Sequence, residues 1–342
     1  MTYALLLAAA LASPPAVPAA AAHAAPSAPP TSSPAEQLDR TFALRARYDA
    51  LYRNVGAAPS LHPAVKDQLV ERTSVGAQTA KLLVTEPDAD VLDDLERRAA
   101  LDEVAVAALL GGPKPAVTAK PGAHVGVATA GDHAEPFAYW VPARYDAAKP
   151  GPIVVLFHSA IQPETDWVAR VFFRELADAT GTIILAPGGN DRDPAAMVRS
   201  VDAAEHALRP VVAWDPKRHY VGGFSDGTFG AFHAVALLNE PCAGFLGIEG
   251  FMMPADARAA GARLRGHGAY IVAGTADDFI PIEEMHKLVR TLRGEHVYAR
   301  LYEPPNAPHA LRPIYTTIAR AWRDMLAGTL TIPNDGYGAV VK

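Results

Sequence analysis

Residues 219 to 232 read H-Y-V-G-G-F-S-D-G-T-F-G-A-F, and this stretch decides the expected fold. An apolar stretch ends at Val221, glycines stand on both sides of Ser225, and an Ala/Phe/Leu-rich segment with helical spacing follows. In this G-x-S-x-G pattern a sharp strand-to-helix turn lifts the serine hydroxyl out of a sheet. The alternative is a glycine-rich turn with an incidental serine, because a chain with 26 glycines can match the bare pattern by chance.

Outward from this turn, short apolar runs alternate with helical patterns. The continuous apolar run 153–157 suits a strand that is buried on both faces. We therefore predict a largely parallel sheet covered by helices on both faces, with an antiparallel pair at its start. The predicted strands are 124–128, 137–141, 153–157, 182–186, 219–223, 244–250, 269–273 and 297–301, and the predicted helices are 165–179, 195–208, 225–238, 282–292 and about 311–326.

Two further residues, an aspartate and a histidine, follow predicted strands and could activate Ser225. A serine hydroxyl is a poor nucleophile at neutral pH, so it needs a base close by and a third group that orients the base. Asp277 follows strand 269–273 in G-T-A-D-D-F-I-P, and His309 follows strand 297–301 in P-P-N-A-P-H-A-L. All three residues then lie at the carboxyl edge of a parallel sheet, where catalytic loops gather. The adjacent Asp278 is the competing acid, and His309 could instead be an exposed loop histidine.

These motifs, in this order, resemble the α/β-hydrolase superfamily. The elbow G-F-S-D-G, the segment D-P-K-R-H-Y-V-G-G from Asp215, the G-x-x-D-x-x-I-P around Asp277 and the late His309 are similar to its secreted esterase, polyester-depolymerase and dipeptidyl-peptidase-like branches. The resemblance covers residues 124 to 328. It implies a mostly parallel α/β-hydrolase sheet flanked by helices and a Ser225, Asp277, His309 triad.

The resemblance also implies an oxyanion hole made of backbone N–H groups. Asp226, directly after the nucleophile at a helix start, is one expected donor, and Ala160 in the loop H-S-A-I-Q is the other. The family's usual pair there is His-Gly, whereas this chain has Ser159. If the turn required a positive φ, Ser159 would be strained or the loop would differ. Gln162 could add a side-chain donor or cap the next helix.

The expected activity is hydrolysis of a carboxylic ester through an acyl-enzyme intermediate. A peptidase or acyltransferase would use the same triad, and a non-catalytic binding protein on a hydrolase scaffold is the alternative from another class. We expect no cofactor and no metal, because the sequence lacks a phosphate loop, a zinc helix and a dinucleotide-binding glycine pattern. The expected partner is a small-molecule or polymeric ester substrate. Oligomeric state stays open.

The region before residue 123 has a different composition. Residues 1–24 combine an apolar run with A-x-A sites and resemble a secretory signal, which predicts a secreted or periplasmic protein. One feature departs from the usual signal, because no Lys or Arg precedes the apolar run. Residues 25–34 suit a flexible linker, and residues 35–110 predict a helical accessory or cap module. Its aromatic residues Phe42, Tyr48 and Tyr52 are expected in its core. A second linker, 111–122, precedes the hydrolase domain, 123–330, and residues 331–342 form a tail.

Overall composition narrows the function classes. The 31 Lys and Arg against 37 Asp and Glu give a net charge of −6 with no basic stripe, which disfavours nucleic acid as a partner. No stretch approaches 18 uninterrupted apolar residues, so no membrane span is predicted. Cys242 is the single cysteine, which rules out an internal disulfide, and we expect it to be buried.

Overall fold

The structure is a computed structural model that describes residues 33–58, 61–160, 162–189, 193–250 and 252–328. The predicted signal peptide, nearly all of the first predicted linker and the predicted C-terminal tail lie outside these ranges. None of the helices in the described ranges has the length and apolar character needed to cross a bilayer.

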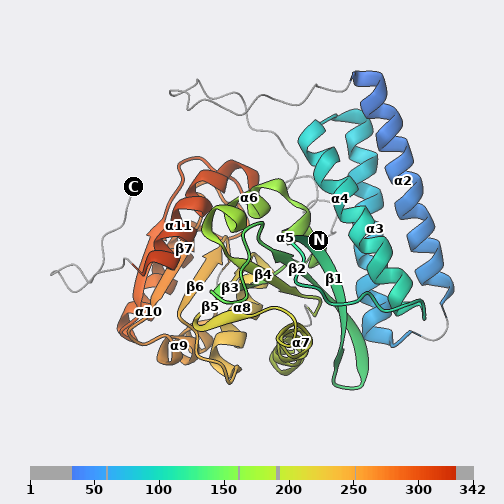
Figure 1. Ribbon diagram of the computed structural model, residues 1–342. Coiled ribbons are helices and arrows are strands. Elements are labelled where there is room, and N and C mark those ends of the chain that lie inside the picture. The colour runs from blue at the N-terminus through green and yellow to red at the C-terminus, as the bar shows by residue number, and fades with distance from the viewer. Residues whose placement is uncertain (1–32, 59–60, 161, 190–192, 251, 329–342) are drawn as a thin grey trace.

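An eight-stranded sheet with the order β1-β2-β4-β3-β5-β6-β7-β8 forms the centre of the molecule (Figure 1). β1 pairs antiparallel with β2 and β2 antiparallel with β4, whereas every later pair is parallel. The predicted antiparallel start of a parallel sheet is therefore confirmed. The strands are β1 (Gly122–Ala130), β2 (His133–Val141), β3 (Gly151–Phe157), β4 (Ile183–Pro187), β5 (Trp214–Phe224), β6 (Gly244–Ile248), β7 (Gly268–Val272) and β8 (Tyr298–Tyr302).

Helices cover both faces of the sheet because its strands are apolar on both sides. In β3, Ile153, Val155 and Phe157 belong to one core cluster, and Val154 and Leu156 belong to the other. The first face packs on α7 (Pro194–Leu208), α8 (Asp226–Leu237), α9 (Pro254–Arg263) and α10 (Ile282–Gly294). The second packs on α5 (Thr165–Ala169), α6 (Val171–Thr180), the 3₁₀ turn η1 (Arg312–Ile314) and α11 (Tyr315–Ala327).

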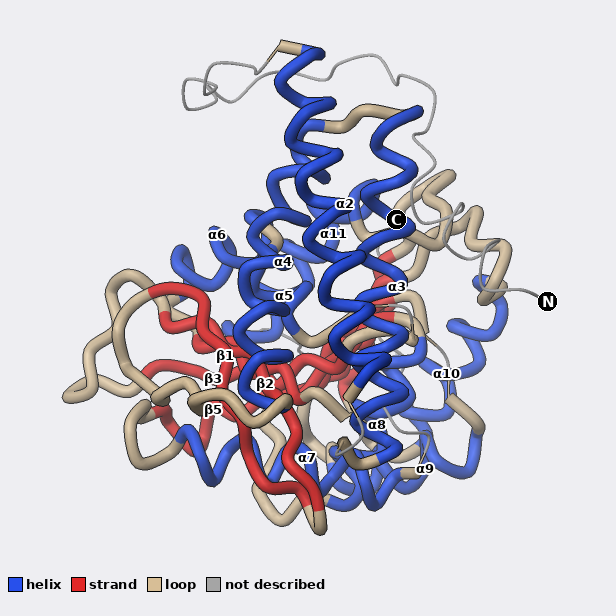
Figure 2. The backbone as a smooth tube through the Cα atoms, turned by 90° about the vertical axis from the view of Figure 1, so that its right-hand side faces the viewer, coloured by secondary structure: helices blue, strands red, loops and turns tan. Residues whose placement is uncertain are grey.

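Three long helices precede the sheet and pack beside one another, as Figures 1 and 2 show. They are α2 (Pro34–Ala57), α3 (Pro63–Thr85) and α4 (Ala89–Leu109). Ser33 and Glu36 form a capping box at the start of α2, with Pro34 in the first turn. Leu44, Tyr48 and Leu69 lie in a core that these helices share.

The prediction that all three aromatic residues of α2 are buried is wrong. Tyr48 is fully buried, but Phe42 and Tyr52 are 49% and 46% exposed. Phe42 and Tyr52 lie outside the 3.6-residue stripe of Leu44, Tyr48 and Leu51 that faces α3 and α4, so the helix turns them toward solvent.

Two helical segments also differ from the prediction. The helix predicted at 165–179 is broken at Arg170, whose extended backbone (φ −68°, ψ 123°) separates α5 from α6. Helix α9 is not among the predicted elements. Its alanine-rich sequence has little apolar periodicity beyond the buried Ala257 and Ala260, so the pattern does not indicate a helix. Cys242 is buried as predicted, and burial raises the pKa of its thiol to about 12.

Candidate active site

Ser225 lies at the turn between β5 and α8, as predicted. Its backbone has φ 54° and ψ −123°, which few residues other than glycine adopt, and its side chain is partly exposed. The amide of Ser225 donates to the carbonyl of Ile248, and the hydroxyl of Thr228 donates to the carbonyl of Gly223. Neighbouring strands and the turn itself therefore hold the strained backbone in place.

Glycine is required at both flanking positions because main chain comes too close for a side chain. A Cβ at Gly223 would lie 2.2 Å from the carbonyl oxygen of Gly227. A Cβ at Gly227 would lie 2.2 Å from the carbonyl oxygen of Phe157, at the end of β3. The pattern of the sequence thus reflects close packing of the elbow against the strand beside it.

The structure brings His309 between Ser225 and Asp277. His309 Nε2 lies 3.0 Å from Ser225 Oγ, and His309 Nδ1 lies 2.7 Å from Asp277 Oδ2. The imidazole is also flanked by the rings of Phe224 and Phe279, whose centroids lie 5.3 and 5.2 Å away. Asp277 lies 52 residues after Ser225 in the sequence, and His309 lies 32 residues after Asp277, yet the three side chains meet at one edge of the sheet.

Asp277, not the adjacent Asp278, contacts the histidine. Its Oδ1 accepts hydrogen bonds from the amides of Phe279 and Ile280, both at 2.8 Å, while Oδ2 faces His309. These donors fix the orientation of the carboxyl group, with Oδ2 toward the imidazole. Asp277 is buried, whereas Asp278 is exposed.

A second carboxyl group, which the sequence motifs did not single out, lies beside this pair. Glu249 follows β6, is fully buried, and has an oxygen 3.9 Å from His309 Nδ1. Burial, together with the nearby charge of Asp277, raises the pKa of Glu249 to about 9. A signal was present, because an acidic residue ends the otherwise apolar run G-F-L-G-I-E.

The predicted oxyanion donors lie where the sequence put them, on the turn and on the loop after β3. Asp226 is the first residue of α8, and Ala160 lies in the β3–α5 loop, next to residue 161, which is outside the described ranges. Their role as donors stays a prediction. Ser159 does not have a positive φ, so the strain considered for this loop is absent. Gln162 does not cap α5, whose N-cap is Glu164 without a side-chain bond.

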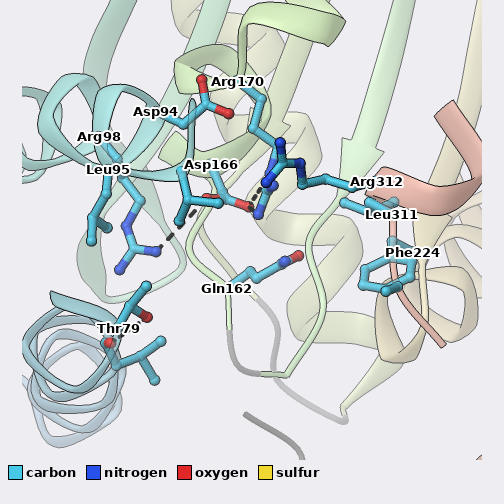
Figure 3. Close-up of a pocket in the computed structure, with 13 residues that line it drawn as sticks. Thr79, Asp94, Leu95, Arg98, Gln162, Asp166, Arg170, Phe224, Leu311 and Arg312 are labelled. Carbon is cyan, nitrogen blue, oxygen red and sulfur yellow. Dashed lines mark hydrogen bonds and ion pairs between the residues drawn. The ribbon is translucent and has the colours of Figure 1, made fainter. Parts of the chain in front are cut away.

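A pocket opens between helices α3 and α4 on one side and Phe224 and Leu311 of the sheet edge on the other (Figure 3). It holds about 760 Å³ of space free of protein atoms, including the part open to solvent. Phe224 and Ala310, the neighbours of Ser225 and His309 in sequence, line one side, and Val75 of α3 together with Val91 and Leu95 of α4 line the other. The N-terminal helices therefore form one wall of a space that Phe224, the residue before Ser225, also lines.

Buried ion pairs hold that wall against the sheet domain. Asp102 of α4 is fully buried, accepts from Thr165 Oγ1 at 2.7 Å and from Tyr48 OH at 3.1 Å, and pairs with Arg98 at 3.3 Å. Arg72 of α3 is also buried and forms an ion pair with Glu164. Burial raises the pKa of the Tyr48 hydroxyl well above its usual range, so this tyrosine acts as a neutral donor.

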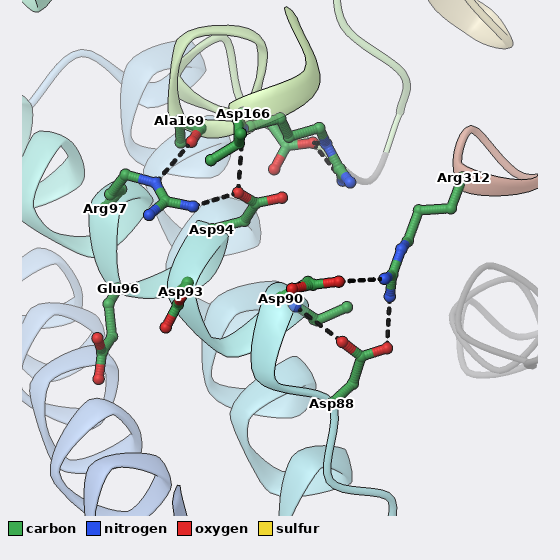
Figure 4. Close-up of polar contacts among 12 residues, drawn as sticks. Asp88, Asp90, Asp93, Asp94, Glu96, Arg97, Asp166, Ala169 and Arg312 are labelled. Atoms are coloured by element: carbon green, nitrogen blue, oxygen red, sulfur yellow. Dashed lines mark hydrogen bonds and ion pairs between the residues drawn. The ribbon is translucent and has the colours of Figure 1, made fainter. Parts of the chain in front are cut away.

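Further polar contacts join the same two parts of the molecule at the surface (Figure 4). Arg312 of η1 pairs with Asp88 and Asp90 at the start of α4, the latter at 3.1 Å. Arg97 donates to the carbonyl oxygen of Ala169 at 3.0 Å. The wall is thus fastened both in the interior and at the rim.

One group of possible metal ligands lies away from this site. His62, Asp132 and His133 offer ligand atoms within 4.8 Å of one another, at the start of α3 and the turn between β1 and β2. Ion pairing accounts for the group, because His133 bonds Asp132 at 2.9 Å and Glu135 at 2.7 Å.

Comparison with known proteins gives a likeness at the level of the fold. No protein-family model matches the sequence, and no curated protein sequence matches it. A putative dipeptidyl aminopeptidase IV from Bacteroides ovatus superposes with a TM-score of 0.50 at 13% identity, covering 60% of this chain and 36% of that one. This chain therefore spans about a third of that protein's length.

Two shorter proteins superpose over nearly their whole length. A dienelactone hydrolase-like promiscuous phosphotriesterase, P91, from metagenomic libraries has a TM-score of 0.48 at 21% identity, covering 60% of this chain and 95% of that one. An S-formylglutathione hydrolase from Agrobacterium tumefaciens has a TM-score of 0.49 at 15% identity, covering 61% and 96%. At these identities the likeness concerns the fold, and the chemistry has to be argued from this chain's own residues.

Proposed function

We propose that this protein, whose fold is that of the α/β-hydrolases as the sequence predicted, is a serine hydrolase that cleaves carboxylic esters. The observation that carries the proposal is the position of His309, whose two ring nitrogens lie 3.0 Å from Ser225 Oγ and 2.7 Å from Asp277 Oδ2. A base within reach of the hydroxyl, with a carboxylate on its other nitrogen, is the arrangement that activates serine.

In the acylation step, His309 Nε2 takes the proton of Ser225 as Oγ bonds to the ester carbonyl carbon. The carbonyl oxygen becomes an oxyanion, for which the amides of Asp226 and Ala160 are the proposed donors. When the intermediate collapses, the bond to the alcohol oxygen breaks and His309 returns the proton to that oxygen. Asp277 stays ionised, holds Nδ1–H, and stabilises the transient imidazolium.

In the deacylation step, water replaces the alcohol as the attacking group. His309 takes a proton from water as its oxygen bonds to the acyl carbon, and then returns that proton to Ser225 as the acyl bond to Oγ breaks. The free acid leaves and the starting state is restored. Neither step calls for a redox change.

The pocket between α3, α4 and the sheet edge supports an apolar acyl or alcohol group as part of the substrate. Its lining nearest the triad is apolar, with Phe224, Ala310 and Leu311, and the facing helices add Val91 and Leu95. The charged side chains that also line the pocket have partners among themselves or their neighbours, such as Arg170 with Asp166 at 2.6 Å. An uncharged ester group fits this lining better than a charged group, which would be desolvated there without a free partner.

Active-site labelling tests the proposal directly. A fluorophosphonate probe should modify the wild-type protein at Ser225 and should leave Ser225→Ala unmodified, and Ser225→Ala should lose on the order of 10⁴-fold or more in turnover of p-nitrophenyl esters. Ser74→Ala, on α3, is the matched control and should behave as wild type. Ester cleavage that persists in Ser225→Ala would refute the assignment, and a protein that never reacts with the probe would be a binding protein.

A substrate panel separates the reactions that share a triad. Wild-type protein is assayed against p-nitrophenyl esters of increasing acyl length, peptide anilides, and an ester with an added alcohol acceptor. We expect the esters to be the best substrates. Faster cleavage of the anilides would make the protein a peptidase, and a product ester formed with the added alcohol in preference to free acid would make it an acyltransferase.

A further inference from the structure

Glu249 is a buried acid that the proposed mechanism does not use. It is 0% exposed and follows β6, one strand away from β7, which carries Asp277 in its following loop. Neither of its carboxyl oxygens has a hydrogen-bond partner of good geometry among the described residues. The amides of Gly274 and Ala310 face the carboxyl group without forming hydrogen bonds of good geometry, and a buried polar group with incomplete partners is costly, so its retention in the interior calls for a reason.

The backbone at Glu249 is fixed as firmly as that of the nucleophile. Its φ of 46° is in the left-handed region that favours glycine, yet glutamate stands here. Its amide donates to the carbonyl of Val272 at 2.8 Å, and the preceding residue, Ile248, accepts from the amide of Ser225 at 2.9 Å. Strained backbone held by its surroundings is common at functional sites.

The side chain reaches the same ring nitrogen that Asp277 contacts. Glu249 Oε2 lies 3.9 Å from His309 Nδ1, against 2.7 Å for Asp277 Oδ2, and one side-chain nitrogen or oxygen atom from each of the three residues lies within 4.8 Å of the other two. The charged or titratable groups that the structure records against Glu249 are Asp277, on the loop after β7, and His309, on the loop after β8. A movement of about 1 Å would bring Glu249 into hydrogen-bond distance of the imidazole.

The two carboxyl groups differ in their hydrogen-bond partners. Asp277 accepts hydrogen bonds from two amides and contacts His309 Nδ1. Glu249 is buried and lies close to the charge of Asp277, which favours its protonated form, although the amides of Gly274 and Ala310 partly oppose this. Two acids that share one base can therefore hold one proton and one negative charge between them.

We propose that Glu249 is a reserve acid for His309: a positioning residue that lies 3.9 Å from Nδ1 and becomes the carboxylate partner of Nδ1 when Asp277 is absent. Burial is the larger cause of the raised pKa of Glu249 and the charge of Asp277 the second, so removal of Asp277 lowers the pKa of Glu249 by removing the second cause. The glutamate can then ionise and orient the imidazole in the tautomer that accepts the proton of Ser225. This inference rests on the proposed serine hydrolase activity.

A double-mutant cycle tests the proposal. At pH 8, Glu249→Gln alone should keep turnover of p-nitrophenyl acetate within about 3-fold of wild type, since a carboxamide resembles a protonated carboxyl group in shape and charge. Asp277→Ala should keep measurable turnover, and Asp277→Ala/Glu249→Gln should lose at least a further 10-fold or so. Glu283→Gln, an exposed glutamate on α10, is the control in both backgrounds.

The pH profile gives a readout that a purely structural role would not move. Turnover by Asp277→Ala should rise with pH as Glu249 ionises, and this rise should be missing from the double variant. If Asp277→Ala does not fold, Asp277→Ser replaces it, because serine can still accept from the amides of Phe279 and Ile280. Circular dichroism checks that each variant is folded.

The outcomes separate the two proposals. Equal losses from Glu249→Gln in the wild-type and Asp277→Ala backgrounds, with parallel pH profiles, would overturn the reserve-acid role while leaving the serine hydrolase intact. Absence of Ser225-dependent turnover in the wild-type protein would instead overturn the proposed function itself.

Discussion

The backbone of Gly227 lies so close to the end of β3 that a residue with a side chain would not fit at this position. A Cβ there would meet the carbonyl oxygens of Phe157 and His158 at 2.2 and 2.6 Å. Both are main-chain atoms of the strand and loop that border the nucleophile, so Gly227→Ala must displace the elbow or β3. We expect this variant to lose about 1–3 kcal/mol of stability and, because Ser225 moves relative to His309, about 10²-fold or more in ester turnover.

Gly56→Ala is the matched control for that substitution. Gly56 lies in α2, and a Cβ added there would have no other atom within 4 Å among the described residues, so alanine should be neutral or stabilising, by up to about 1 kcal/mol. Urea denaturation and ester turnover are measured for both. Wild-type turnover by Gly227→Ala would contradict the close-packing argument.

The raised pKa of Glu249 makes a prediction for stability against pH. Its pKa is about 9 in the folded protein against 4.5 for an unperturbed glutamate, so between these values the folded state keeps a proton that the unfolded chain releases. The stabilising contribution of Glu249 is thus full below about pH 4.5 and falls as pH rises toward 9, by at most about 1.4 kcal/mol per pH unit.

Glu249→Gln should remove this part of the pH dependence. The free energy of unfolding of the variant, relative to wild type, should increase steadily between about pH 5 and pH 9. Urea denaturation at a series of pH values measures the difference, with Glu283→Gln as an exposed control. Curves for wild type and Glu249→Gln that run parallel over this range would mean that the buried carboxyl group has an ordinary pKa.

At the scale of single residues, the sequence is informative where a pattern reports local geometry. Ser225, Asp277 and His309 can be assigned because each follows a strand, and parallel strands end at one edge. Strand position alone does not separate Asp277 from Asp278, the family resemblance favours Asp277, and the structure shows that Asp277 is the one that reaches the histidine. Glu249 escapes prediction because it belongs to no motif and stands at the end of an apolar run that predicts only a buried strand.

Among the elements, α4 carries a buried charged side chain, Asp102, whose burial depends on its ion-pair and hydrogen-bond partners. This carboxylate pairs with Arg98 and lies 3.8 Å from Arg72, and both arginines are buried. Asp102→Asn would remove the carboxylate nearest to the buried Arg98, whose other recorded carboxylate is Asp166 at 3.7 Å, and we expect this to cost about 3–5 kcal/mol. We expect the thermal midpoint to fall markedly and α3 and α4 to lose protection from hydrogen exchange first.

The neighbouring Glu103 provides the control for Asp102. It pairs with Arg47 at 2.7 Å, but these side chains are 41% and 35% exposed, so solvent screens the pair. Glu103→Gln should therefore cost no more than about 1 kcal/mol. Equal destabilisation by the two substitutions would show that burial of the ionic cluster does not matter.

The elements themselves are predictable where their periodicity is strong. The stripe of Leu44, Tyr48 and Leu51 and the two-sided apolar strand β3 both appear in the structure. The break at Arg170 is not predictable, because nothing in the sequence there is a helix breaker. The contacts of Arg170 with Asp166, and of the following amide of Val171 with Asp94 of α4, form only in the folded chain.

For the whole molecule, the position of α3 and α4 beside the active-site edge makes them part of the pocket. Val91→Phe would fill the space beside Leu95 and Phe224 without touching the triad. We expect kcat/KM for long-chain p-nitrophenyl esters to fall by about 10-fold, which corresponds to about 1.4 kcal/mol, while the acetate ester is cleaved as by wild type.

Val104→Phe is the matched control on the same helix, since Val104 is 44% exposed and is not among the residues that line the pocket. It should leave both activities unchanged. If Val91→Phe lowers turnover of the acetate and of the long-chain ester equally, the pocket does not hold the acyl chain.

The position of α3 and α4 beside the pocket could not be predicted from the sequence. The sequence predicts a helical cap module, but no pattern in it indicates a contact between helices 63–109 and the loops that carry Ser225, Asp277 and His309.

The proposed triad comes entirely from the chain after residue 224, while six of the 13 residues that line the pocket come from the chain before residue 100. In the proposed enzyme, substrate selectivity and reactivity would therefore be encoded in separate stretches of the gene. Libraries that randomise only codons 75, 79, 91 and 95 should sample new substrate preferences while Ser225, Asp277 and His309 stay unchanged.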